Sequence, residues 1–89
     1  MLDYGVGEDL YWDPARKEVR FSVAQGERRL LCRIEAAALG PRCAEAPGEG
    51  VCLDSARRHF GHITHRISDK LALGLTEPDG SVLIRAKDW

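Results

Sequence analysis

The sequence has no long hydrophobic run, no excess of charge of either sign and no repeated or low-complexity segment. No apolar stretch approaches the ~20 residues that span a bilayer. The acidic start, Met1-Leu2-Asp3-Tyr4-Gly5, lacks the basic and apolar regions of a signal peptide. We therefore expect a cytoplasmic protein that does not associate with a membrane.

The balance of charge excludes partners that are held by bulk charge alone. Thirteen Lys and Arg stand against fourteen Asp and Glu, a formal net charge of −1. Such a chain is not held on a nucleic-acid backbone or an anionic membrane by its overall charge. Only local patches can provide an electrostatic site.

The chain is short and has few cysteines. Its 89 residues, 44% hydrophobic and 30% charged, predict one domain over 1–89 with one modest core, in which 1–9 form a loose N-terminal arm. Three cysteines are an odd number in a chain without an export signal, so we expect reduced thiols rather than a disulfide framework. Cys32 alternates with apolar neighbours, which predicts a core position.

Alternating side chains predict a β-hairpin. Apolar residues recur at every second position over 19–23 and again over 30–34, and Gly26 between them suits a tight reversal. A further short strand is expected near Leu10. After the turn at Asp79-Gly80, residues 81–86 are expected to form another strand.

Helical spacing predicts one long and one short helix. Apolar residues at spacings of three and four predict a helix over 54–73, with Asp54 as N-cap and Gly74 as the stop. Residues 35–44 predict a short helix that Gly40-Pro41 interrupts. The expected fold class is α+β: a small antiparallel sheet of three or four strands with the long helix packed on one face. The expected core is Val19, Phe21, Val23, Leu30, Cys32, Ile34, Leu39, Phe60, Ile63, Ile67, Leu71, Val82 and Ile84.

Several short motifs resemble the small bacterial proteins of the domain of unknown function 1488 family. They are Tyr11-Trp12-Asp13-Pro14, Val19-Arg20-Phe21, Cys32-Arg33-Ile34, Ala38-Leu39, Arg58, Ile63, Lys70, Asp79-Gly80-Ser81-Val82-Leu83-Ile84 and Asp88-Trp89. These motifs determine fold. Because the family has no established activity, the resemblance implies a fold and supplies no site residues.

The most distinctive predicted surface is the sheet face opposite the core. Residues 16–33 carry six bases and two acids, and period-two alternation places the arginines together. The candidate binding residues are Arg20, Arg29, Leu31, Arg33, Leu83 and Arg85. Guanidinium groups with exposed leucines favour a non-catalytic interaction or regulatory module, with an acidic protein partner or self-association. A simple solvated face is the alternative.

Other functions have weaker support. We do not expect nucleic acid as a partner, because the face lacks stacking aromatics, although an accessory nucleic-acid binder remains an alternative. His59, His62 and His65 recur at every third residue, which rotates each by about 60° around a helix and does not bring them to one ion. No nucleophile, phosphate loop or cofactor motif is evident. We therefore name no catalytic residue, metal ligand or cofactor, and a small metal protein or enzyme is the least favoured class.

Overall fold

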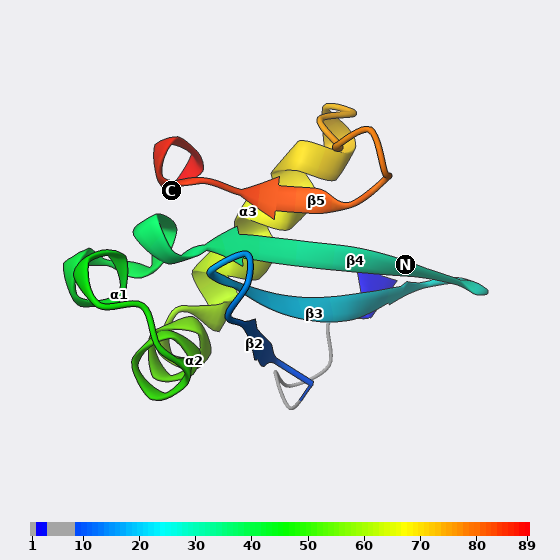
Figure 1. Ribbon diagram of the computed structural model, residues 1–89. Helices are drawn as coiled ribbons and strands as arrows, with labels where there is room; N and C mark the ends of the chain where they lie inside the picture. Colours follow the sequence, from blue (N-terminus) through cyan, green and yellow to red (C-terminus); the bar gives the residue numbers. More distant parts are fainter. Residues whose placement is uncertain (1, 4–8) are drawn as a thin grey trace.

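The computed structural model describes residues 2–3 and 9–89, which adopt an α+β fold (Figure 1). All helices longer than a single turn lie between the fourth and fifth strands of this described chain. The elements are β1 (Leu2–Asp3), β2 (Tyr11–Asp13), β3 (Glu18–Gln25), β4 (Arg28–Glu35), the 3-10 helix η1 (Ala36–Leu39), α1 (Pro41–Glu45), α2 (Glu49–Arg58), α3 (Phe60–Ala72), β5 (Val82–Ile84) and the 3-10 helix η2 (Ala86–Asp88).

The predicted hairpin is confirmed as β3 and β4. The strands pair antiparallel over their full length, with Phe21 opposite Cys32 and Val19 opposite Ile34. Gly26 takes a φ of 64° in the two-residue connection, a conformation that favours glycine. The strand expected near Leu10 is also present as β2, which pairs with the first residues of β3.

The expectation of a wholly antiparallel sheet is wrong. β5 pairs with β4 in parallel, with Cys32 opposite Val82, so the sheet is mixed. Its order is β1-β3-β4-β5, and β2 pairs with β3 beside β1. A parallel neighbour needs a crossover of a dozen or more residues, and α1, α2 and α3 provide that crossover.

The predicted single helix over 54–73 is two helices. α2 ends at Arg58 and α3 begins at Phe60, because His59 between them leaves the helical region at φ −107° and ψ 19°. Asp54 is therefore not an N-cap: it lies inside α2, where its carboxylate pairs with Arg58. The prediction of one long and one short helix is wrong.

The stop at Gly74 is confirmed. Gly74 has a φ of 70°, its N–H donates to Leu71 O at 3.2 Å, and the Leu75 N–H donates to Lys70 O at 2.8 Å. These are the two hydrogen bonds of a Schellman motif. The short helix predicted over 35–44 is split into η1 and α1, because Gly40 between them has a φ of 110°.

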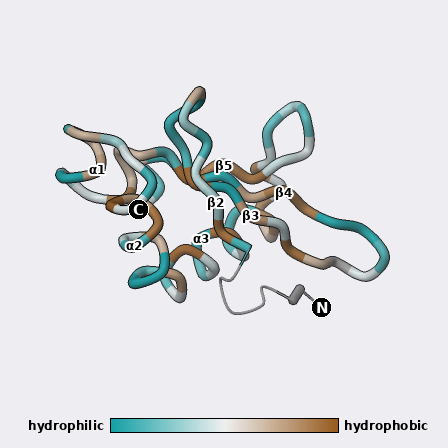
Figure 2. The backbone as a smooth tube through the Cα atoms, turned by 60° about the horizontal axis from the view of Figure 1, so that its bottom comes forward, coloured by the Kyte–Doolittle hydropathy of each residue, from teal (hydrophilic) through white to brown (hydrophobic). Residues whose placement is uncertain are grey.

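The core lies between the sheet and α3, which passes behind the strands in Figure 1. Ile63 and Ile67 are fully buried there. Most of the predicted core is confirmed, whereas Leu30, Phe60 and Leu71 are only partly buried at its edge. Figure 2 shows hydrophobic stretches on the strands and on the segments that face them. No helix in the described ranges is long and apolar enough to cross a membrane.

Part of the predicted N-terminal arm lies outside the described residues, namely 1 and 4–8. Within the arm, β1 pairs with Ala24 and Gln25 of β3. The Asp9 carboxylate accepts a hydrogen bond from the Ser22 N–H at 3.1 Å.

Candidate functional site

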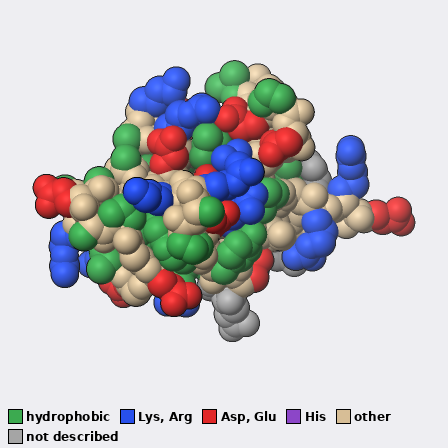
Figure 3. All heavy atoms as spheres, in the orientation of Figure 1, with side chains coloured by type: hydrophobic (Ala, Val, Ile, Leu, Met, Phe, Trp, Pro, Cys, Tyr) green, Lys and Arg blue, Asp and Glu red, His purple; other side chains and the backbone are tan. Residues whose placement is uncertain are grey.

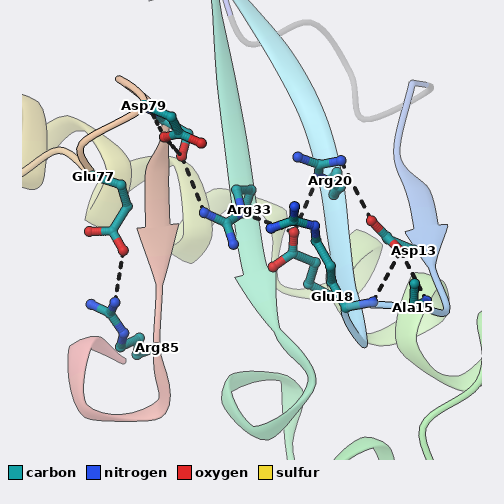
Figure 4. A network of polar contacts seen from close by, with 10 residues as sticks. Asp13, Ala15, Glu18, Arg20, Arg33, Glu77, Asp79 and Arg85 are labelled. Carbon is teal, nitrogen blue, oxygen red and sulfur yellow. Dashed lines mark hydrogen bonds and ion pairs between the residues drawn. The ribbon is translucent and has the colours of Figure 1, made fainter.

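Arg20 and Arg33, two of the predicted binding residues, lie side by side on the sheet face opposite α3 and are paired with Glu18 (Figure 4). Arg33 Nε donates to Glu18 Oε1 at 2.9 Å. Arg20 Nε lies 3.2 Å from the same oxygen in an ion pair, and Arg20 Nη1 lies 3.5 Å from Asp13 Oδ2. Glu18 is only 3% exposed. Both guanidinium charges are therefore neutralised within the chain.

The Arg33 guanidinium is the centre of this network. Its hydrogen bond with Glu18 raises the pKa of Arg33 above the usual value, although burial opposes the shift. Arg33 Nη1 also donates to Ser81 Oγ at 3.3 Å, and Ser81 Oγ donates to Asp79 Oδ1 at 2.6 Å. Arg33 thus ties β3, β4 and the turn before β5 together, which is a structural role.

Arg85 and Leu83 are also less available than the sequence predicts. Arg85 Nη2 donates to Glu77 Oε1 at 2.8 Å. Leu83 is only 7% exposed, so the expectation that it offers apolar contact area is wrong. β5 is buried along its whole length, and Lys70 Nζ donates to the Leu83 carbonyl at 2.7 Å.

Arg29 and Leu31 remain available at the far half of the hairpin, together with Arg28. Arg28 and Arg29 are exposed and form no ion pair with any described residue, and Leu31 is partly exposed. The hairpin end projects from the rest of the chain, and hydrophilic residues occupy part of it (Figure 2). Of the six predicted residues, three arginines are engaged in ion pairs and Leu83 is buried. Arg29 and Leu31 are the two that remain available.

The outer edge of β4 is open at the same place. β5 pairs only with residues 32–34, so residues 28–31 have no strand partner among the described residues on the side away from β3. The Ser22 N–H points to Asp9, away from β4. Its register partner Leu31 therefore directs its own backbone groups away from β3, and so does Arg29 two residues earlier.

The acidic members of the face are what sequence reasoning missed. Figure 3 shows Asp and Glu side chains intermingled with Lys and Arg over the sheet. The signal was present, because period two places Glu18 on the same face as Arg20. Asp13 reaches the face because β2 pairs with β3, with Asp13 opposite Glu18.

The three histidines do not gather into a metal site. His62 Nε2 lies 3.1 Å from the Trp89 carbonyl, and the rings of His59 and His62 contact the Trp89 ring. His65 Nε2 lies 3.7 Å from Asp69 Oδ2. In the described part of the chain no group of three His, Cys, Asp or Glu side chains could hold a metal ion.

The expectation that all three cysteines are reduced thiols is wrong. Cys43 on α1 and Cys52 on α2 form a disulfide, with their Cα atoms 5.5 Å apart. The packing of α1 on α2 brings them together, and both are buried. Cys32 is a free, fully buried thiol as predicted, and burial, with a smaller contribution from Asp9, raises its pKa to about 12.

Comparisons of the chain with family models, with curated proteins and with solved structures each return no match. The geometry of the chain itself is therefore the basis for a functional proposal.

Proposed function

We propose that the protein is a non-catalytic interaction module, and that it binds an extended acidic segment of a partner protein along residues 28–31 of β4. One observation carries the proposal: the open strand edge and the two unpaired arginines, Arg28 and Arg29, occur at the same place. A free edge pairs with an added strand through backbone hydrogen bonds, and side chains then select the partner.

The charge of this edge selects an acidic partner. Planar guanidinium groups suit carboxylates, and no carboxylate of the described chain occupies Arg28 or Arg29. Leu31 adds partly exposed apolar area on the outer face, which it shares with Arg29. Arg20, Arg33 and Arg85 contribute a neutral polar surface, because each is already paired.

The test uses a defined peptide. A labelled peptide of about eight alternating Glu and Val residues, and the same peptide with Lys in place of Glu, are titrated against the protein. We expect only the acidic peptide to bind and to shift the amide resonances of 28–31. The variant Arg28→Glu, Arg29→Glu should weaken binding at least about tenfold, or about 1.4 kcal/mol.

A matched variant separates the edge from overall charge. Arg57→Glu, Lys87→Glu makes the same change in net charge at two exposed residues that lie outside the hairpin. It should leave peptide binding nearly unchanged. Equal losses in the two double variants would show that charge alone attracts the peptide and would overturn the proposal.

Leu31→Asp distinguishes a protein partner from nucleic acid. Binding to a protein segment should survive moderate salt and fail in Leu31→Asp, because apolar contacts are not screened. Binding to a single-stranded oligonucleotide should instead fall steeply with salt and hardly depend on Leu31, because counterion release dominates. Self-association along the same edge would appear as a dimer in native mass spectrometry that the double arginine variant abolishes.

Two further sequence expectations remain part of the proposal. Membership of the domain of unknown function 1488 family is supported by the motifs that the sequence shares with it, most of which lie in β2 to β5. A cytoplasmic location is proposed as well, although the Cys43–Cys52 disulfide weighs against it, since cytosolic reductants keep most thiols reduced.

A further inference from the structure

A groove of about 530 Å³ lies between α1 and α2, at the end of the molecule opposite the hairpin tip. Its size falls within the range of about 300–1,000 Å³ that is typical of small-molecule sites. Two links hold its walls in place: the Cys43–Cys52 disulfide between the helices, and the hydrogen bond from Ser55 Oγ to the Leu39 carbonyl at 2.6 Å. The groove is therefore a built feature of the fold rather than a gap between loose segments.

The lining of the groove is mainly apolar. Leu39, Pro41 and Val51 contribute side chains, and Val51 is 38% exposed although it is a large hydrophobic residue. Gly40 and Gly50 contribute none, and a Cβ added at either position would meet nothing within 4 Å. Gly40 is required by its φ of 110°, whereas Gly50 lies in the first turn of α2 without such a constraint. The backbone conformation at position 50 therefore does not require glycine.

The charged groups on the groove favour an anion. Arg42 on α1 is exposed and forms no ion pair with a described residue. Among the described residues Arg58 on α2 pairs only with Asp54, at 3.1 Å, and both side chains are about two-thirds exposed, at 66% and 67%. Exposed pairs of this kind are weak, so a second carboxylate can compete for Arg58. Two arginines stand against one carboxylate around an apolar surface.

We propose that this groove binds a small amphipathic monocarboxylate. Its apolar body would lie on Leu39, Pro41 and Val51, and its carboxylate would pair with Arg42 and Arg58. Because the groove and the free edge of β4 lie at opposite ends of the sheet, this site is independent of the proposed partner surface.

The test compares three probes of equal chain length with different head groups. Octanoate and octylamine are titrated below their critical micelle concentrations and octanol below its solubility limit, and binding is followed by the amide resonances of α1 and α2. Octanoate should bind about tenfold more tightly than octylamine and several-fold more tightly than octanol, since only its head group complements the arginines. Equal affinity for octanoate and octanol, or resonance shifts confined to other elements, would overturn the proposal.

A pair of glycine variants tests the location. Gly50→Leu adds a side chain at a residue that lines the groove, whereas Gly61→Leu places the same side chain on α3, where a Cβ also meets nothing within 4 Å. Neither glycine has a positive φ, so neither substitution strains the backbone. Gly50→Leu should weaken octanoate binding at least about tenfold and Gly61→Leu should leave it unchanged. Equal binding by both variants would place the ligand elsewhere.

The variant Arg42→Gln, Arg58→Gln tests the head-group contact and leaves the apolar lining residues Leu39, Pro41 and Val51 unchanged. It should lower the affinity for octanoate to that for octanol and leave octanol binding unchanged. This double variant is an independent test if Gly50→Leu does not fold. A double variant that still prefers octanoate to octanol would refute the contact with Arg42 and Arg58.

Discussion

Glu18 on β3 and Arg33 on β4 form an ion pair across the outer sheet face, with Arg33 Nε 2.9 Å from Glu18 Oε1. Glu18 is 3% exposed, and its carboxylate also pairs with Arg20. A face that is rich in arginine is thereby held together by one buried acid. This relationship explains why arginine content alone overstates how much of the face is free to bind a partner.

Removing the Glu18 carboxylate should therefore destabilise the fold. We expect Glu18→Ala to lower the free energy of unfolding by about 3 kcal/mol, because it leaves Arg20 and Arg33 without their shared partner. The measurement is urea denaturation followed by circular dichroism. Glu35→Ala is the control, since Glu35 lies directly opposite Glu18 and pairs of like charge are unfavourable there. A Glu18 variant no less stable than the Glu35 variant would contradict this interpretation.

Phe21 and Phe60 should differ in their importance although their rings touch, with centroids 5.3 Å apart. Phe21 is fully buried in the sheet, whereas Phe60 is only partly buried at the start of α3. Phe21→Ala should cost about 4 kcal/mol and Phe60→Ala about 2 kcal/mol, because the cavity left at Phe60 opens toward solvent. Denaturation midpoints of the two variants give the comparison, and equal losses would argue against it.

The hairpin and the core were predictable because each depends on a local pattern. Alternation around Phe21 and Cys32 follows directly from the two-residue period of a strand. The stop at Gly74 was predictable for the same reason, since a left-handed residue after an apolar helical stripe needs glycine. These features need no knowledge of distant parts of the chain.

The features that were missed depend on distant contacts. β5 has three residues, all buried, so no alternation shows which neighbour it takes or in which direction. The break at His59 does not interrupt the apolar spacing from Ala56 to Phe60, so the sequence pattern continues across it. The Cys43–Cys52 disulfide depends on how α1 folds back on α2. The arginines of the candidate face were predicted, but the pairing of Arg20 and Arg33 with Glu18 was not.

The Cys43–Cys52 disulfide should contribute measurably to stability. Its ends are nine residues apart, and closing a loop of that size in the unfolded chain corresponds to about 2–3 kcal/mol. Cys43→Ser and Cys52→Ser should each lower the stability by that amount under oxidising conditions. With reductant present, the wild type should fall to the level of the variants. A wild type that is insensitive to reductant would show that the disulfide does not form in solution.

Acid should weaken the contact between α3 and the C-terminal turn. Burial raises the pKa of the Asp88 carboxyl, but hydrogen bonds from Lys70 Nζ and the Arg85 N–H outweigh it and leave the pKa below its usual value. The folded state therefore binds this proton more weakly than the unfolded state does. The resulting stability is fully present above the ordinary Asp pKa of about 3.9 and is lost as the pH falls through the lower folded value.

Asp88→Asn isolates this contribution. At pH 7 the variant should melt at a lower temperature than the wild type, and the difference should shrink as the pH falls below about 4. The pKa of Asp79 is also lowered, chiefly by hydrogen bonds from Ser81. The stability of both the wild type and Asp88→Asn should therefore keep some dependence on pH in the acid range. A melting difference that stays constant from neutral to acid pH would show that the Asp88 charge has no part in it.

The Cys32 thiol should be inert in the native protein. It is fully buried, and its pKa of about 12 leaves almost no thiolate at pH 8. Iodoacetamide should therefore label it only at the rate at which the protein unfolds, and addition of urea should accelerate labelling. The variant Cys43→Ser, Cys52→Ser leaves Cys32 as its only cysteine and gives the cleanest measurement by mass spectrometry. Rapid labelling of Cys32 in that variant without denaturant, while it remains folded, would show that β4 opens to solvent far more readily than its burial implies.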